Sequence, residues 1–301
     1  MNGAPAGPAP HTRPPRRPVP AAPVVDAHHH VWDLSVRDQD WITGPAMAPI
    51  RRDFGVADLA PEAHAAGVGA TVLVQTVTVP EETPEFLALA DGSDLIAGVV
   101  GWTDLTAPGI ADTLAALREL PGGDKLVGIR HQVQGEPDPE WLLRPAVQDG
   151  LAAVAAAGLA YDLVVLPHQL PAATAAAALL PQLTFVLDHL GKPPIATGAL
   201  DPWAGHIRAL AARPNVVCKV SGMVTEAAWD AWSARTLRPY TETVLDAFGS
   251  ARLMFGSDWP VCRLAASYAE VMDVTRTLTA DLSENERRAV FGATATAVYG
   301  L

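Results

Sequence analysis

The sequence contains only two cysteines, Cys218 and Cys262, among 301 residues. Two cysteines are too few for a disulfide framework, and these two lack the short spacing of a metal-binding pair. Both stand in apolar segments, where buried free thiols are the expected state. We therefore expect a protein of the cytoplasm, where thiols stay reduced.

Long hydrophobic runs are also missing. No apolar stretch reaches the roughly 18 residues that a membrane-spanning helix needs. The two most apolar stretches, 152–166 and 172–180, are rich in alanine and are interrupted by polar residues or glycine. We expect no association with membranes.

Basic side chains are fewer than acidic ones. The chain has 21 lysines and arginines against 33 aspartates and glutamates, which gives a formal net charge of −12 at pH 7. Because non-specific nucleic-acid binding needs a basic face, this balance argues against a nucleic-acid partner. An anionic small molecule is still compatible with it, since local basic residues can line a pocket. No feature of the sequence sets an oligomeric state.

The first 23 residues differ from the rest of the chain. They are rich in proline, alanine and glycine and include Arg13, Arg16 and Arg17. A signal peptide requires an apolar core after its basic start, and prolines interrupt this stretch throughout. We expect a disordered tail over residues 1–23.

The remaining chain has material for a large core, since hydrophobic residues make up 49% of the sequence. Short apolar runs recur along it. Several of them are rich in Val, Ile or Leu without strict alternation, which is typical of parallel strands covered on both faces. There are eight such runs, at 24–28, 70–75, 96–101, 126–131, 160–165, 184–188, 216–220 and 252–256.

Segments with helical patterns separate these runs and end near glycine or proline, as helices do. Pro239 predicts a break within the segment 225–248. Ser283 and Glu286 have the spacing of a capping box. The helical segments are 56–66, 83–90, 107–119, 140–157, 170–180, 203–212, 225–248, 264–279 and 283–291.

Eight strands alternating with helices predict an α/β fold, a slightly elaborated TIM-type (β/α)8 barrel that forms one domain over residues 24–301. The alternative is an open doubly wound sheet. That fold wants a glycine-rich phosphate-binding turn after its first strand. Here the first strand runs into His28, His29 and His30 instead, so a nucleotide-binding sheet is disfavoured.

Histidines end the first predicted strand. Side chains at positions i and i+2 of a strand share a face, so His28 and His30 are both expected to point into the barrel mouth and His29 away from it. Barrel enzymes carry their reactive groups at this C-terminal end of the strands. We interpret His28 and His30 as functional residues.

Two later strands end in similar polar groups. Asp188 and His189 end the sixth predicted strand, with Asp188 a candidate supporting carboxylate and Lys192 close enough in sequence to reach an anionic substrate group. Asp258 follows a Gly-Ser step after the eighth strand. A carboxylate at that position can accept a proton from water held by nearby imidazoles. Ser257 lacks the Gly-x-Ser-x-Gly context of a nucleophile elbow, which argues against a serine hydrolase.

Taken together and in this order, these motifs resemble those of the amidohydrolase superfamily, in particular its amidohydrolase-related group that includes sugar and dicarboxylate lactonases. The resemblance covers residues 24–301. The matching segments are Asp26-x-His28-x-His30-x-Trp32, Gly128-Ile129-Arg130-His131, Asp188-His189-Leu190-Gly191-Lys192-Pro193, Phe255-Gly256-Ser257-Asp258-Trp259-Pro260 and Phe291-Gly292-x-Thr294-Ala295-x-x-x-Tyr299-x-Leu301.

The resemblance implies a role for each matched position. Asp258 corresponds to the general base that activates water. His28, His30 and His189 correspond to the cluster that binds a divalent metal or polarises the scissile carbonyl. Arg130 corresponds to a position that holds an anionic or hydroxylated substrate. Further candidates for substrate contact are Lys192, Tyr161, Trp102 and Trp32, and the loop 33–53 with Trp41 and Arg51–Arg52 is expected to contribute to the pocket.

The number of metal ions is constrained by the fourth predicted strand. Binuclear members of the superfamily use a modified lysine at the C-terminal end of that strand, whereas Lys125 here lies at its N-terminal end. We therefore expect at most one divalent ion, zinc or manganese. Its ligands would be His28, His30, His189 and Asp258, with His168 as a further candidate. Relatives also include metal-independent lactonases, so catalysis by hydrogen bonding alone stays an alternative.

The resulting hypothesis is a hydrolase that opens a small-molecule lactone, either a sugar lactone or an acidic lactone. In it, Asp258 activates water and the histidines stabilise the oxyanion. Two alternatives remain: a metal-dependent decarboxylase of the same superfamily, and a non-catalytic binding protein on a barrel scaffold. The second would be expected to have lost the histidine and aspartate set, which is whole in this sequence.

Overall fold

The structure is a computed structural model that describes residues 23–301. The predicted disordered tail lies outside these residues, apart from Pro23. Eight parallel strands form a single sheet in the order of the sequence, from β1 to β8. The strands are β1 (Val24–His29), β2 (Val68–Val74), β3 (Ile96–Gly101), β4 (Leu126–His131), β5 (Ala160–Leu163), β6 (Phe185–Leu187), β7 (Val216–Val220) and β8 (Leu253–Phe255).

The sheet comes round to meet itself just beyond the last strand. His29 forms a parallel bridge with Trp259. The backbone N–H of His30 donates to the carbonyl of Trp259 at 2.7 Å, and that of Asp258 donates to the carbonyl of His28 at 2.8 Å. The predicted TIM-type barrel is therefore confirmed, and the contacts that close it run through the residues of the predicted site.

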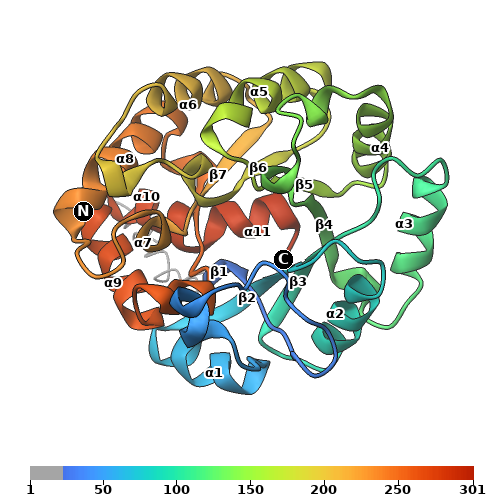
Figure 1. The fold of residues 1–301 in the computed structure, drawn as a ribbon, viewed down its shortest axis with the longest axis horizontal. Coiled ribbons are helices and arrows are strands. Elements are labelled where there is room, and N and C mark those ends of the chain that lie inside the picture. Colours follow the sequence, from blue (N-terminus) through green and yellow to red (C-terminus); the bar gives the residue numbers. More distant parts are fainter. Residues whose placement is uncertain (1–22) are drawn as a thin grey trace, which may run out of the picture.

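Helices surround the strands on the outside (Figure 1). The helices between consecutive strands return the chain to the N-terminal end of the barrel, so that the C-terminal strand ends collect at one mouth. The helices are α1 (Val56–Ala65), α2 (Glu82–Asp91), α3 (Ile110–Arg118), α4 (Pro145–Ala156), α5 (Leu170–Leu179), α6 (Trp203–Ala211), α7 (Met223–Glu226), α8 (Ala234–Phe248), α9 (Tyr268–Leu278), α10 (Glu284–Arg288) and α11 (Thr294–Tyr299).

The predicted helix break near Pro239 is wrong. Pro239 lies inside α8, and the helical segment is interrupted earlier, between α7 and α8. Ser233 begins the second helix, because its hydroxyl accepts the backbone N–H of Thr236. The missing N–H of Pro239 is tolerated because the opposite face of α8 is buried, with Leu237 and Val244 in the core. Tertiary packing here outweighs the local cost of proline.

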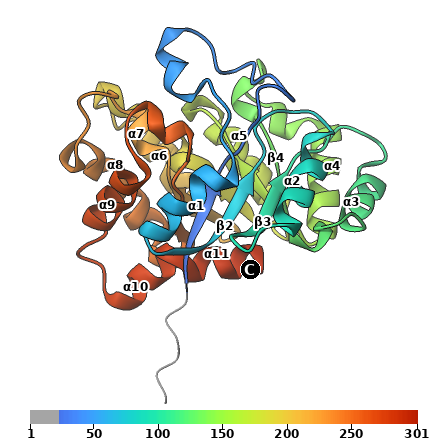
Figure 2. The same ribbon diagram turned by 90° about the horizontal axis from the view of Figure 1, so that it is seen from below.

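The C-terminal helix α11 was not predicted, and it determines how the barrel ends. It lies at the end of the barrel opposite the loop that follows β1 (Figure 2). Ala295 and Tyr299 of this helix join a buried cluster with inward-facing strand residues such as Val186 and Met254. The helix therefore fills the N-terminal end of the barrel and leaves the other end open to a substrate.

Candidate active site

His28 and His30 lie side by side at the mouth of the barrel. Their exposed fractions are 0% and 5%, and their Nε2 atoms are 3.1 Å apart. As predicted, these two rings share a face, although the pairing of β1 with β2 is irregular between Asp26 and His29. His29 is fully buried, and its ring nitrogens have no hydrogen-bond partner among the described residues.

A backbone carbonyl sets the proton on His30. Its Nδ1 lies 2.7 Å from the carbonyl oxygen of Val74, at the end of β2. Because a carbonyl oxygen only accepts hydrogen bonds, Nδ1 must carry the proton. Nε2 of His30 therefore presents a lone pair to the site.

His189 reaches the same point from β6. Its backbone has φ 54°, in the left-handed region, just after the strand ends at Leu187. Its Nδ1 lies 2.9 Å from the hydroxyl of Ser221, which follows β7. Gly222 lies against the ring: a Cβ atom there would come within 2.6 Å of Nδ1 of His189. The glycine is therefore required for the imidazole to occupy this position.

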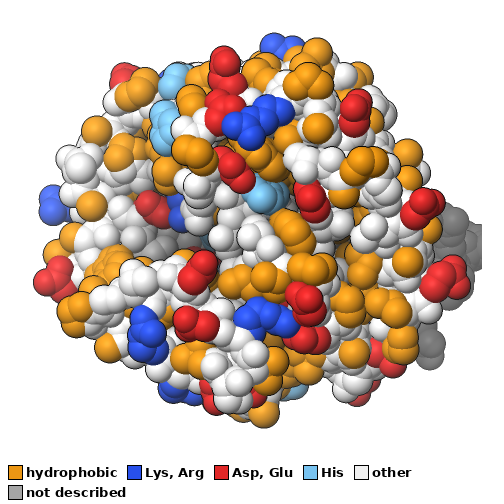
Figure 3. Space-filling model, turned by 45° about the vertical axis from the view of Figure 1, so that its right-hand side comes forward, with side chains coloured by type: hydrophobic (Ala, Val, Ile, Leu, Met, Phe, Trp, Pro, Cys, Tyr) orange, Lys and Arg blue, Asp and Glu red, His pale blue; other side chains and the backbone are white. Residues whose placement is uncertain are grey.

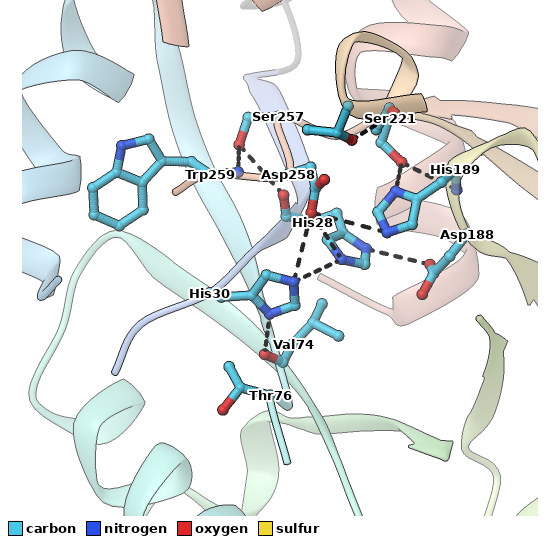
Figure 4. A network of polar contacts seen from close by, with 12 residues as sticks. His28, His30, Val74, Thr76, Asp188, His189, Ser221, Ser257, Asp258 and Trp259 are labelled. Atoms are coloured by element: carbon cyan, nitrogen blue, oxygen red, sulfur yellow. Dashed lines mark hydrogen bonds and ion pairs between the residues drawn. The ribbon is translucent and has the colours of Figure 1, made fainter. Parts of the chain in front are cut away.

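Asp258 completes the cluster from β8. Figure 4 shows the three imidazoles converging on its carboxylate, whereas the indole of the neighbouring Trp259 points away. Oδ1 of Asp258 lies 3.9 Å from Nε2 of His28, 3.7 Å from that of His30 and 3.9 Å from that of His189. The backbone of Asp258 is left-handed, with φ 57°. Such a conformation in a residue other than glycine is held by its surroundings and is common at functional sites.

Burial and charge set the protonation of this cluster. Burial lowers the pKa of His28 and of His30, and it lowers that of His189 to about 4, so all three rings are neutral at neutral pH. Burial alone raises the pKa of Asp258. His189 and the hydrogen bond with His30 outweigh it and hold that pKa below its ordinary value. The site therefore combines neutral imidazoles with an ionised carboxylate.

Arg130 lies beneath the histidines, and most of its donors are already engaged. It is 4% exposed. NH1 donates to Oδ2 of Asp188 at 2.9 Å, and Nε and NH2 donate to the side-chain oxygen of Gln75 at 3.0 and 2.8 Å. The guanidinium thus anchors Asp188 and Gln75, with its edge at the floor of the pocket.

Lys219 is a site residue that was not predicted from the sequence. It is fully buried in the barrel, where Nζ lies 2.5 Å from Asp162, 3.1 Å from Asp188 and 3.1 Å from Nδ1 of His28. The hydroxyl of Tyr299 donates to Asp162 from the opposite side, at 2.9 Å. The one available signal is a lysine within an apolar strand. Lysine is almost never fully buried without partners.

His28 has two possible proton positions in this setting. Its Nδ1 lies 3.2 Å from Oδ1 of Asp188 and 3.1 Å from Nζ of Lys219. With the proton on Nδ1, the ring donates to Asp188 and Nε2 presents a lone pair, as a metal ligand requires. With the proton on Nε2, Nδ1 accepts from Lys219 and Nε2 donates to His30. The first form suits a bound cation and the second suits a metal-free site.

The donor set fits one divalent cation. Ligand atoms of a tetrahedral zinc site lie about 3.3 Å apart, given metal–ligand distances of about 2.0–2.1 Å. The corresponding separations here are 3.1 Å between the two Nε2 atoms of β1 and 3.7–3.9 Å from these rings and His189 to Asp258. The described residues contain two groups of possible ligands that share His28, namely His28 with Asp188 and His189, and His28 with His30 and Asp258.

The positions of one lysine and one histidine bear on the metal predictions. Lys125 lies at the N-terminal end of β4, where Nζ donates to the carbonyls of Ser93 and Ile96 at 3.1 and 2.9 Å. His168 is exposed in a short 3-10 turn before α5 and belongs to neither group of possible ligands. The structure therefore does not bring His168 to the cluster, because the chain continues outward past the end of β5.

A pocket of about 280 Å³ opens above the cluster. Among the predicted substrate contacts, Arg130 and Lys192 line it, and Trp41 of the loop 33–53 forms part of its wall. Other residues on this wall are Met47, Thr76, Gln132, Gln134, Val164, Thr225, Glu226, Trp229, Val261 and Leu264.

The other aromatic candidates lie elsewhere. Trp32 packs edge-to-face against Phe54 and donates to the carbonyl of Arg52, outside the pocket lining. Tyr161 is fully buried against Phe185, and Trp102 donates to Nδ1 of His131 at 3.0 Å. Neither lines the pocket. Arg51 and Arg52 are exposed, and they too are absent from its lining.

Comparison with known proteins gives consistent matches. A family model described as Amidohydrolase matches residues 25–301. L-Fucono-1,5-lactonase of Burkholderia multivorans is 43% identical over 292 residues, which cover 92% of this chain and 96% of that protein. A protein of the same name from Burkholderia ambifaria is 40% identical and covers 82% of this chain and 83% of its own length. The crystal structure of an amidohydrolase from Burkholderia multivorans with bound zinc has a TM-score of 0.88 at 41% identity, over 93% of this chain and 100% of that chain.

Proposed function

We propose that this chain, which belongs to the amidohydrolase family, is a lactonase that hydrolyses the ring ester of a sugar lactone. The observation that carries the proposal is the single carboxylate oxygen of Asp258 within 3.7–3.9 Å of three buried imidazole nitrogens, at the floor of an open pocket. The similarity to proteins named L-fucono-1,5-lactonase supports this choice of substrate class.

In the proposed reaction, Asp258 is the general base. Its lowered pKa keeps it ionised at neutral pH, so it can accept a proton from the attacking water. The water oxygen forms a bond to the lactone carbonyl carbon, and the carbonyl oxygen takes up negative charge. When the ring C–O bond breaks, Asp258 returns its proton to the departing ring oxygen. The product is an open-chain hydroxy acid.

The imidazoles supply the environment of the carbonyl. His28, His30 and His189 are neutral and fixed by Lys219 or Asp188, by Val74 and by Ser221, respectively. With Asp258, they would hold one divalent ion, zinc or manganese. When bound, such an ion polarises a carbonyl and lowers the pKa of water towards about 7. In the absence of an ion, the second proton arrangement places Nε2–H of His28 in a hydrogen bond with Nε2 of His30.

The experiment that tests the proposal is product analysis with a panel of substrates. Purified protein is given neutral sugar 1,5-lactones, acidic lactones and aromatic carboxylic acids, and acid release is followed by pH-stat with the spontaneous rate subtracted. We expect hydrolysis of a sugar lactone well above the spontaneous rate. Release of carbon dioxide from an aromatic acid, with no lactone hydrolysis, would instead establish a decarboxylase.

The proposal includes a small-molecule partner and a cytoplasmic location. No helix in the part of the chain that the structure describes is long and apolar enough to cross a membrane. On the face in Figure 3, acidic and basic side chains are scattered among others without a broad basic patch, which accords with a small-molecule partner. Cys218 and Cys262 are buried and free, as expected of a protein in the reducing cytoplasm.

A further inference from the structure

Four charged side chains line the pocket. They are the cations Arg130 and Lys192 and the carboxylates Glu226 and Asp258, and Asp258 belongs to the cluster that would hold a metal ion. A substrate carboxylate that lies away from this cluster would therefore need one of the two cations to be free.

Neither cation is free. The N–H groups of Arg130 are engaged by Asp188 and Gln75, and NH1 also lies 3.4 Å from Nε2 of His28. Nζ of Lys192 lies 3.5 Å from Oε1 of Glu226, and the side chains of this pair are only 21% and 27% exposed. In such a partly desolvated position, the opposite charge is screened less than at an open surface. Glu226 thus cancels the charge that Lys192 would otherwise offer to an anion.

The uncharged polar groups of the pocket favour a hydroxylated ligand. Gln132, Gln134 and Thr225 line it together with the indoles of Trp41 and Trp229. The side-chain oxygen of Gln134 is buried and has no hydrogen-bond partner among the described residues. It needs a donor, and a hydroxyl group can donate whereas a carboxylate cannot.

We propose that Glu226 is a specificity-determining residue that, by neutralising Lys192, restricts the pocket to uncharged polyhydroxylated lactones and excludes lactones bearing a carboxylate. This inference rests on the proposed lactonase function and names the substrate class within it. An acidic lactone that placed its carboxylate beside Lys192 would lie against Glu226, which already pairs with that cation. Like charges brought together on binding are a strong barrier to the wrong ligand.

The test is a comparison of two lactones that differ in one group. D-Glucono-1,4-lactone ends in a hydroxymethyl group, and D-glucaro-1,4-lactone ends in a carboxylate at the same carbon. The value of kcat/KM is measured for each, or Ki against a preferred lactone where turnover is slow. The wild type is expected to favour the neutral lactone, and Glu226→Gln to raise the acidic-to-neutral ratio by about tenfold or more.

The opposite substitution separates charge from structural damage. Lys192→Met leaves Glu226 unpaired, so the acidic-to-neutral ratio is expected to fall below that of the wild type. The double variant Lys192→Met/Glu226→Gln is expected to lose the gain of the single Glu226→Gln variant, because no cation remains. Damage to the pocket would lower kcat/KM for both lactones alike. It would not change the acidic-to-neutral ratio in opposite directions in the two single variants. If Glu226→Gln does not fold, the decrease in Lys192→Met alone still tests the inference.

The matched control is an ion pair outside the pocket. Glu85 pairs with Arg37 at 2.9 Å on the outer side of the barrel, and Glu85→Gln is expected to leave the ratio unchanged. An unchanged ratio in Glu226→Gln or Lys192→Met, or equal use of both lactones by the wild type, would overturn the inference while leaving the lactonase function intact. Wild-type protein that hydrolyses no lactone at all would overturn the proposed function itself.

Discussion

Nζ of Lys219 lies 3.1 Å from Nδ1 of His28 and 2.5 Å from Oδ2 of Asp162, so a fully buried cation stands directly behind a ring of the histidine cluster. The same nitrogen is 3.1 Å from Asp188. Because this ammonium holds both carboxylates and contacts the ring, we expect it to orient the ring and to influence which nitrogen of His28 carries the proton. Lys219 acts on the reaction through His28 and is a positioning residue.

Replacing Lys219 tests this positioning role. Lys219→Met is expected to lower kcat for a sugar lactone by about 10–100-fold, the usual effect of removing a group that orients a site ligand, with KM changed much less. Lys125→Met is the matched control. Lys125 is also held by several acceptors, but these are backbone carbonyls at the N-terminal end of the barrel, so its loss should lower thermal stability and leave kcat unchanged. If Lys125→Met changed kcat and KM in the same way as Lys219→Met, the role of Lys219 would be merely structural.

Gly222 provides a second prediction, because its missing side chain makes room for His189. Gly222 has φ 62°, and an added Cβ atom would come within 2.6 Å of Nδ1 of His189. Gly158 has φ 69° with nothing within 4 Å of an added Cβ atom. Gly158→Ala should therefore cost only the backbone strain, about 1–2 kcal/mol of unfolding free energy. Gly222→Ala should lose lactonase activity in addition to paying this strain. Urea unfolding measures the stability of both variants, and kcat/KM measures their activity. Equal activity in the two variants would contradict the assigned position of His189.

Metal content gives a third prediction. Elemental analysis of the purified protein should find at most one divalent ion per chain, because β4 has no lysine at its C-terminal end to bridge a second ion. Neutral imidazole and carboxylate ligands suit zinc or manganese. His30→Ala should lower the bound metal strongly, and chelator should remove it from the wild type. His168→Ala, at an exposed turn, is the control that should retain it. Two ions per chain would refute the mononuclear site.

Tyr299 links the C-terminal helix to the charged interior of the barrel. Its hydroxyl donates to both oxygens of Asp162, at 3.0 and 2.9 Å. Tyr299→Phe should therefore reduce the free energy of unfolding by about 1.5–3 kcal/mol, as for a hydrogen bond to a charged group. Tyr240→Phe is the control: its hydroxyl donates to the carbonyl of Ala199 at 3.1 Å, and about 1 kcal/mol is expected. Similar decreases in the free energy of unfolding for the two variants, measured by urea unfolding, would show that the Tyr299 hydroxyl contributes no more than an ordinary hydrogen bond.

The sequence predicted the barrel and its four-residue cluster because both depend on local patterns. Eight apolar runs at barrel spacing indicate eight strands, and a strand carries i and i+2 side chains to one face, as for His28 and His30. Polar residues directly after an apolar run stand at the strand's C-terminal end, as Asp188, His189 and Asp258 do. Connectivity along the chain then suffices to gather these ends at one mouth.

The parts that could not be predicted depend on contacts distant in sequence. Lys219 finds its partners on β1, β5 and β6, and nothing local to its strand indicates them. Tyr161 and Trp102 stand close to strand ends, yet their neighbours turn them into packing contacts. The break expected at Pro239 failed for the same reason, since burial of one helix face outweighed a local preference.

The central claim is that Asp258 is the base of a lactone hydrolysis, and turnover of L-fucono-1,5-lactone by wild type and Asp258→Asn tests it most directly. The asparagine keeps the shape of the side chain but cannot accept the proton of water. Loss of a general base costs about 10²–10⁴-fold. We predict a fall in kcat/KM of at least 100-fold at an unchanged thermal midpoint. Asp258→Asn turnover within about tenfold of a lactone-hydrolysing wild type would contradict the account.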